Sequence, residues 1–153
     1  MQFIDGGVTA PQGFTANGIL NHIKASRKTP DTALIDSELP CRAAGVFTQN
    51  RVKAECVKLT KAHIASGRAQ AVIANSGNAN ACTGSQGYAN AQKTAEAVAA
   101  VLGVAADDVL VCSTGVIGQQ LPVEKITDNI QALAAGLSKQ GHETARLPTL
   151  PPT

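Results

Sequence analysis

The chain has 153 residues, a formal net charge of +2 and only 16% charged residues, a charge too weak and dispersed for a nucleic-acid-binding surface. It is long enough for one domain, and with no Trp, one Tyr and three Phe its core must consist mainly of Ala, Val, Ile and Leu. No apolar run approaches the roughly 18 residues of a membrane span, and the N-terminus has no signal-peptide pattern. We expect a cytoplasmic protein that contacts neither nucleic acid nor membrane, with part of its sparsely charged surface covered by another segment.

Short apolar runs predict strands through the first half of the chain. Residues 54–59 alternate between apolar and polar side chains, which is typical of a half-covered strand. Thr60 could then cap a short helix over residues 61–66 that stops at Gly67. The other strands that we expect are residues 16–23, at the edge of the sheet, 32–36 and 43–48.

Two strand–loop–helix units follow in the second half. In the first, residues 69–74 predict a strand, and apolar residues at helical spacing predict a helix that ends at Leu102, before Gly103. In the second, an apolar strand starts at Val109 and breaks at Ser113. These units predict α/β layers in which helices cover the sheet. If the two strands are parallel, both glycine-containing loops lie at one edge of the sheet, where open α/β sheets bind ligands.

The last part of the chain starts with a helical pattern and then loses all periodicity. Pro122 suits the first turn of a helix that ends near Gly136. The segment from His142 onwards contains three prolines and no regular pattern. We therefore assign residues 1–140 to the domain and residues 141–153 to a disordered tail. The apolar face of the expected helix consists of Val123, Ile126, Ile130 and Leu133.

The residues at the end of the second strand could stabilise negative charge. Gly115 has no side chain, so its backbone N–H is accessible, and the Thr114 hydroxyl can turn a proton towards the same point. Two donors that converge on one spot describe an oxyanion hole. The alternative is that residues 113–115 form only a strand-ending turn.

The loop over residues 75–84 is rich in Asn and Gly. Asn75, Gly77, Asn78 and Asn80 could hold a carboxylate or phosphate on the substrate side of a site. The loop lacks the lysine of a phosphate-binding loop and does not fit G-x-G-x-x-G. The alternative is a tight loop that needs positive φ angles at Asn and Gly.

Other reactive side chains carry weaker signals. Cys82 and Cys112 adjoin the two loops and could act as nucleophiles beside a base, although a thiol in an apolar run is usually inert. The four cysteines lack zinc-site spacing, and we expect reduced thiols that act as small buried residues. Basic residues between Arg42 and Lys61 could attract an anionic substrate or form a solvated face. We place three histidines at the surface, namely His22, His63 and His142.

Four motifs that occur in a fixed order are far more specific together than any one of them. Together they resemble the N-terminal part of the ornithine acetyltransferase family, the bifunctional glutamate N-acetyltransferases of arginine biosynthesis. The likeness extends from about Gly6 to about Leu133. The motifs are GVTAPQGF (7–14), AAGVFTQNRVKA (43–54), NSGNANACTG (75–84) and CSTGVIG (112–118).

The resemblance implies a mechanism and an assembly. Family members cleave themselves at an Ala–Thr bond into α and β chains, which assemble as an α2β2 heterotetramer of sheets sandwiched between helices. The new N-terminal threonine of the β chain takes acetyl from N-acetylornithine and passes it to glutamate. Some members also use acetyl-CoA as a co-substrate, and no bound cofactor is implied. The family's oxyanion hole corresponds to Thr114 and Gly115.

The sequence departs from the family pattern after residue 140. The family continues with an M-T-T-D segment, the cleavage site and the nucleophilic threonine, and none of these is present here. We therefore expect the 153-residue chain to lack acetyltransferase activity on its own. The competing hypotheses are a non-catalytic domain that binds a small anion and an inactive truncated fragment.

Overall fold

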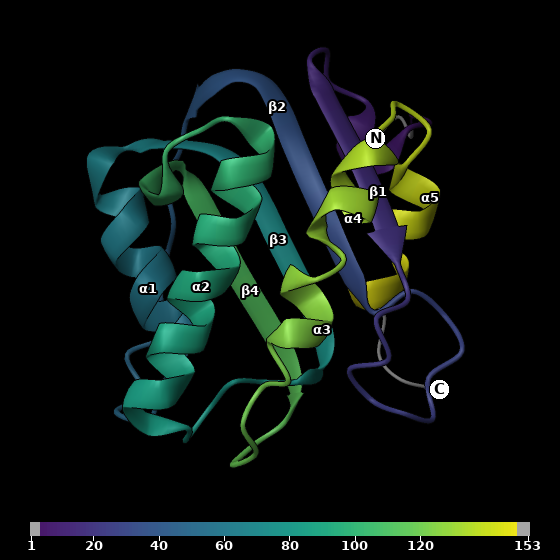
Figure 1. The fold of residues 1–153 in the computed structure, drawn as a ribbon. Coiled ribbons are helices and arrows are strands. Elements are labelled where there is room, and N and C mark those ends of the chain that lie inside the picture. The colour runs from purple at the N-terminus through teal and green to yellow at the C-terminus, as the bar shows by residue number, and fades with distance from the viewer. Residues whose placement is uncertain (1–3, 150–153) are drawn as a thin grey trace.

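The computed structural model describes residues 4–149, which fold around a four-stranded mixed sheet (Figure 1). The strand order is β1-β2-β3-β4; the first two pairings are antiparallel, and β3 and β4 are parallel. A parallel pair needs a crossover connection, and α2 (Gly84–Leu102) supplies it. The expected α/β class and the expected parallel pairing are both confirmed. The strands are β1 (Phe14–Ile19), β2 (Thr32–Arg42), β3 (Arg68–Asn78) and β4 (Val109–Val116).

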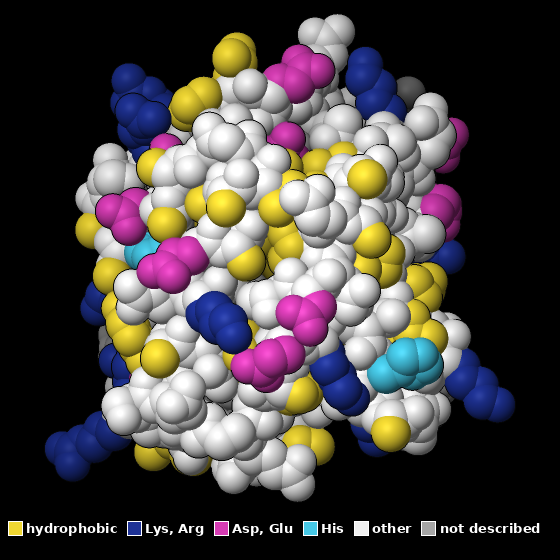
Figure 2. Space-filling view, in the orientation of Figure 1, with side chains coloured by type: hydrophobic (Ala, Val, Ile, Leu, Met, Phe, Trp, Pro, Cys, Tyr) yellow, Lys and Arg dark blue, Asp and Glu magenta, His cyan; other side chains and the backbone are white. Residues whose placement is uncertain are grey.

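Helices α1 to α4 cover one face of the sheet (Figure 1). Leu34 of β2 and Ile73 of β3 are paired in the sheet, and both are buried in the main core under these helices. Figure 2 shows basic and acidic side chains interspersed over this side of the molecule. The other helices on this face are α1 (Glu55–His63), α3 (Glu124–Thr127) and α4 (Ile130–Ala135), and the 3-10 turns of the chain are Gly7–Thr9, Ile64–Ser66, Ala106–Asp108 and Leu147–Thr149.

The opposite face of the sheet is covered unevenly. Over β1 and β2, Ala145 of α5 (His142–Ala145) packs against Ala16 and Ala33 in a small second core. Because side chains alternate along a strand, the residues next to Ile73 and Val111 point to this same face. There, over β3 and β4, the side chains are only partly buried or exposed. We call this region the open sheet face; it consists of Val72, Ala74, Leu110 and Cys112.

Both edges of the sheet are closed by other parts of the chain. At the β1 edge, the backbone groups of Ala16 and Ser138 exchange hydrogen bonds of 3.0 and 3.1 Å. At the β4 edge, the Thr60 hydroxyl bonds both the N–H and the carbonyl of Val111. One turn further along α1, the Nδ1 atom of His63 lies 2.8 Å from the Val109 carbonyl oxygen. Side chains of α1 therefore satisfy the backbone of an edge strand.

Three predictions in the first half of the chain are wrong. Residues 55–59 belong to α1, preceded by Ala54 as its N-cap, because Cys56, Leu59 and His63 recur at helical spacing and are all buried against the core. Thr60 lies inside this helix and caps no helix, although Gly67 does end the segment in the left-handed conformation. Residues 43–48 form no strand. The strand predicted over residues 32–36 instead runs to Arg42, with a break in register between Asp36 and Cys41.

The second half follows the predictions more closely. Gly103 ends α2 with a φ of 71°, as expected. The helix predicted after Pro122 is two short helices, α3 and α4, and its expected apolar face is buried throughout. None of the helices within residues 4–149 is long and apolar enough to cross a membrane.

The predicted disordered tail is wrong for residues 141–149. These residues form α5 and a 3-10 turn, and both Ala145 and Pro148 are buried. The start of this segment lies so close to β1 that a Cβ at Gly141 would overlap the Ala16 carbonyl. The segment therefore packs as part of the domain, because it covers apolar surface that β1 and β2 would otherwise expose. Residues 150–153 lie outside the described residues.

Candidate functional site

The end of β4 lies directly beside the end of β3. In the parallel pairing, Ser76 is opposite Thr114 and Gly77 is opposite Gly115. The sequence predicts that this strand breaks at Ser113. That prediction is wrong, because β4 continues to Val116. A serine or threonine followed by glycine thus occurs at the same level of both strands.

Gly115 is the residue that permits this close pairing. Its φ angle is +134°, which side chains rarely adopt. A Cβ placed there would also overlap backbone atoms of Gly77 and Asn78. Glycine is therefore required at position 115 for two independent reasons, and the missing side chain lets the backbones of β3 and β4 approach closely.

The Thr114 hydroxyl is free to bind another molecule. The residue is exposed, and alternation along β4 places its side chain on the side of the open sheet face. Within residues 4–149, no hydrogen-bond partner is recorded for this hydroxyl. Thr114 therefore presents a donor to whatever covers this side of the sheet.

Ser76 is a polar residue of this site that the sequence analysis missed. It is opposite Thr114 in the register, is 4% exposed, and its Oγ has no hydrogen-bond partner among the described residues. The signal that could have found it is the repeated pattern of a hydroxyl residue before glycine, at Ser76-Gly77 and at Thr114-Gly115. Two hydroxyl groups therefore meet at the ends of the parallel pair.

Ser113 has a structural position on the helix-covered face. Its hydroxyl donates a 2.7 Å hydrogen bond to Oδ1 of Asn75. Nearby, burial raises the pKa of the Cys56 thiol, and hydrogen bonding to Ser113 partly opposes that effect. Neighbouring residues of β4 thus differ in role: Ser113 is engaged by the protein interior, whereas Thr114 faces outwards.

The asparagine side chains predicted to hold an anion are occupied by protein groups. Asn75 donates to the Asn78 carbonyl, and Asn78 donates to the carbonyls of Gln119 and Gln120. Asn80, which is fully buried, donates to one backbone carbonyl and accepts from the Thr83 hydroxyl. The geometry therefore favours the interpretation of this segment as a tight structural loop.

The backbone of this segment agrees with that interpretation. Positive φ angles occur at Gly77, Asn80, Cys82 and Gly84, as expected for a tight loop at Asn and Gly. The predicted loop starts later than expected, because residues 75–78 still belong to β3. A substrate role for Asn75, Gly77, Asn78 and Asn80 remains a prediction.

The cysteines and histidines are only partly as predicted. Cys56 is buried, but Cys82 and Cys112 are exposed, so these two thiols are not the buried core residues that we expected. Desolvation, followed by the proximity of Cys56, raises the pKa of the Cys112 thiol. His63 is buried and not at the surface, because its ring caps the edge of β4. Of the two remaining histidines, His22 is exposed, as predicted, and His142 is partly buried.

The basic residues favour the solvated-face interpretation. Arg42, Arg51 and Lys61 are exposed, and Lys58 forms a 2.7 Å ion pair with Glu55 one turn away on α1. Among the described residues, no group of three or more His, Cys, Asp or Glu side chains could hold a metal ion. The chemistry that this part of the chain offers is therefore hydrogen-bond donation at the end of β4.

Known proteins share both the sequence and the fold. A family model described as the ArgJ family matches residues 15–147. The arginine biosynthesis bifunctional protein ArgJ of Caldanaerobacter subterraneus is 50% identical over 141 residues, which are 92% of this chain and 34% of that protein. The ArgJ protein of Symbiobacterium thermophilum is 49% identical over 144 residues, with 92% and 35% covered. The chain thus spans about a third of the length of the curated relatives that it matches.

Solved structures show the same arrangement. The crystal structure of ArgJ from Bacillus halodurans superimposes with a TM-score of 0.89 at 38% identity, over 97% of this chain and 77% of that chain. The ornithine acetyltransferase of Mycobacterium tuberculosis, solved in complex with ornithine, gives a TM-score of 0.87 at 46% identity, with 92% and 76% covered. The family match extends to residue 147 and so includes most of the segment expected to be an atypical tail. The chain belongs to the ArgJ family.

Proposed function

We propose that this chain supplies the oxyanion-stabilising part of an acetyltransferase of arginine biosynthesis, which moves acetyl from N-acetylornithine to glutamate. The observation that carries the proposal is the exposed Thr114 hydroxyl, which has no hydrogen-bond partner within residues 4–149, beside the exposed Gly115. The relative from M. tuberculosis, 46% identical, is an ornithine acetyltransferase that was solved with ornithine. This relative supports the choice of an amino-acid acetyl donor.

The chemistry requires donors at this position. Attack of a nucleophile on an acetyl carbonyl forms a tetrahedral intermediate whose oxygen carries negative charge. The Thr114 hydroxyl donates a hydrogen bond to that oxygen, and the backbone N–H of Gly115 is the second donor. Such donors act where charge develops, and removing one typically costs about 10²–10³ in rate. The nucleophile, a threonine, lies in the portion of the family protein beyond this chain, and acetyl-CoA can enter as a second acetyl donor without any bound cofactor.

The rest of the family protein is the partner that we propose for the open sheet face. Relatives are about three times as long as this chain, and Val72 and Leu110 are apolar residues of a sheet face left only half buried. The same chain covers 76–77% of the solved chains but 34–35% of the curated proteins. A precursor cleaved into two chains accounts for that difference, and we propose an α2β2 assembly in which the second chain lies on this face.

The test reconstitutes the enzyme from two parts. The chain is purified together with the remaining two thirds of the C. subterraneus relative, and formation of N-acetylglutamate from N-acetylornithine and glutamate is measured. We expect no turnover by the chain alone and turnover by the reconstituted pair. Thr114→Ala in the pair should lower kcat by about 10²–10³, because one oxyanion donor is lost.

Two controls separate this effect from damage to the fold. Thr29→Ala removes an exposed threonine far from β4 in the sequence, and it should leave turnover unchanged. Thermal unfolding of the Thr114→Ala chain should match the unmodified chain, since no described group depends on that hydroxyl. Near-normal turnover of the reconstituted Thr114→Ala enzyme would refute the oxyanion role, and turnover by the isolated chain would refute the need for a partner.

A further inference from the structure

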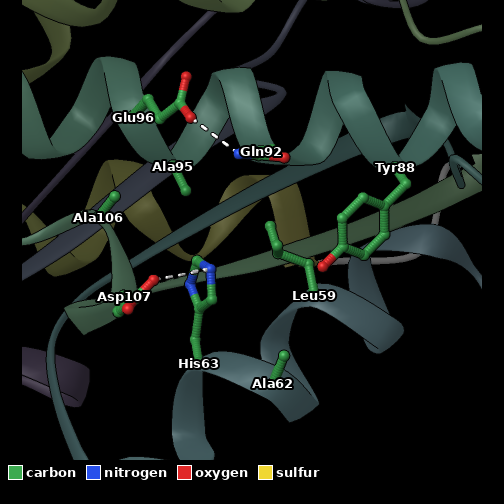
Figure 3. A pocket seen from close by; sticks show the side chains of 9 residues that line it. All are labelled: Leu59, Ala62, His63, Tyr88, Gln92, Ala95, Glu96, Ala106 and Asp107. Atoms are coloured by element: carbon green, nitrogen blue, oxygen red, sulfur yellow. Dashed lines mark hydrogen bonds and ion pairs between the residues drawn. The ribbon is translucent and has the colours of Figure 1, made fainter.

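A hollow between α1 and α2 has no part in the proposed acetyl transfer. Its volume is about 370 Å³, which is within the range of small-molecule pockets. Leu59 and Ala62 of α1 line one side, and Ala95 of α2 and Ala106 line the other (Figure 3). The space exists because three of these four wall positions are alanine, so the helices approach without filling the gap between them.

A buried histidine marks the inner end of the hollow. Nδ1 of His63 lies 2.8 Å from the Val109 carbonyl oxygen, which can only accept, so Nδ1 carries the proton of that hydrogen bond. Nε2 is the atom that faces Asp107, at 3.6 Å from its Oδ1 (Figure 3). When the ring is neutral, Nε2 is an acceptor beside the carboxylate, and a single donor placed over both atoms can bond the two of them; when the ring is protonated, it forms an ion pair with Asp107.

The other polar groups around the hollow also suit a positive charge. Glu96 lies at the rim on α2, where its Oε1 accepts a 3.1 Å hydrogen bond from Gln92, and Tyr88 contributes an aromatic ring to the wall (Figure 3). Aromatic rings attract cations through their negative faces. In the space-filling view, a histidine between acidic side chains is visible on the α1–α2 side (Figure 2). No lysine or arginine is among the described residues that line the hollow, so among them His63 alone can offset the charge of Asp107 and Glu96.

We propose that this hollow binds a small organic cation, an ammonium or guanidinium group on a short apolar stem. The charged head lies against the Asp107 carboxylate and Nε2 of His63, and the stem extends along the alanine walls towards the Tyr88 ring (Figure 3). The site is separate from the Thr114 site: it adjoins the start of β4, and five residues of strand, about 16 Å, separate Val109 from Thr114. The inference therefore does not depend on the proposed acetyl transfer.

The test titrates the full, isotopically labelled chain with n-butylammonium and follows the ring signals of His63 and Tyr88 by NMR. We expect saturable shifts of both rings, and at least tenfold weaker binding of n-butanol, which has the same stem without the charge. Asp107→Asn should weaken butylammonium binding by at least fivefold, because the carboxylate faces the head group. Ala62→Leu, at an exposed helix position, should fill the hollow and abolish binding.

Asp128→Asn is the matched control. It removes an exposed carboxylate at the end of α3, away from the hollow, and should leave the affinity for butylammonium unchanged. Circular dichroism verifies that each variant is folded. Equal affinities for butylammonium and butanol would overturn the proposal, as would an unchanged affinity in Asp107→Asn or the absence of saturable shifts in the unmodified chain.

Discussion

The segments at the ends of β3 and β4 both contain a hydroxyl residue followed by glycine, at Ser76-Gly77 and Thr114-Gly115. Their polar side chains nevertheless have opposite surroundings. At the end of β3 and in the loop that follows it, the side chains of Asn75, Asn78 and Asn80 are buried and bonded to the protein. At the end of β4, Thr114 is exposed and its hydroxyl has no recorded partner within residues 4–149. The asparagine amides of the first segment are thus bonded within the protein, whereas the Thr114 hydroxyl of the second is available to another molecule.

This difference separates residues that maintain the fold from residues available for chemistry. A buried amide with all its partners in place stabilises the fold, and its removal leaves other groups unsatisfied. An exposed hydroxyl without a partner adds little to stability. We therefore expect substitutions in the first segment to change the free energy of unfolding, and substitution of Thr114 to change turnover alone.

The largest expected effect on stability is at the point where the two segments meet. Gly115→Ala combines a positive φ angle with overlap of the new Cβ and the backbone of Gly77. We expect a loss in the free energy of unfolding well above the roughly 1–2 kcal/mol of a left-handed alanine. The control is Gly67→Ala, because Gly67 also has a positive φ angle but no atom within 4 Å of the added Cβ. Chemical denaturation measures the free energy of unfolding of the two variants. Equal losses in the two variants would contradict the close-packing argument.

Asn80→Ala is expected to have the next largest effect. It leaves the buried Thr83 hydroxyl without its acceptor, removes a second donor from the Gly87 carbonyl of α2, and does so in a fully buried position. Each unsatisfied buried group costs about 1–3 kcal/mol. The matched control is Asn129→Ala, which removes an exposed amide bonded to the Lys125 carbonyl and should cost much less. A loss at position 80 no greater than that at position 129 would mean that the loop does not need its internal hydrogen bonds.

The smallest effect concerns two thiols, one in each segment. Cys82 and Cys112 are both exposed, but desolvation raises the pKa of Cys112, so less of it is thiolate at a given pH. We expect Cys112 to react more slowly with iodoacetamide, and its rate to keep rising with pH above 9.0, the ordinary value for a thiol. Mass spectrometry of each peptide measures both rates. Binding of the remaining family segment should protect Cys112, on the open sheet face, more than Cys82; equal protection would contradict the proposed docking face.

The sequence predicts best where one element is long and its pattern unambiguous. The spacing that predicts α2 extends over several turns, and Gly103 ends it as expected. Residues 54–59 alternate as a strand would, but Cys56, Leu59 and His63 also share a helical face, and packing against β4 decides in favour of the helix. The choice depends on a tertiary contact that six residues cannot reveal.

The same limit applies to the candidate site. Thr114 and Gly115 can be singled out from the sequence because a hydroxyl and a glycine end an apolar run. The same pattern of a hydroxyl residue before glycine occurs at Ser76-Gly77, but only the register that places Ser76 opposite Thr114 shows that the two belong to one site. Nor does the asparagine-rich pattern show whether its amides bind a ligand or each other, because only the folded loop shows that Asn80 is bonded to Gly87 and Thr83.

The closed edges of the sheet have a consequence for how this domain associates with others. Exposed strand edges invite pairing with foreign strands and lead to aggregation. Here Ser138 occupies the β1 edge, and Thr60 and His63 occupy the backbone groups of β4 that a foreign strand would use. Continuous strand addition is therefore blocked on both sides, so the domain can leave one sheet face open for a specific partner without also offering an edge for fibril growth.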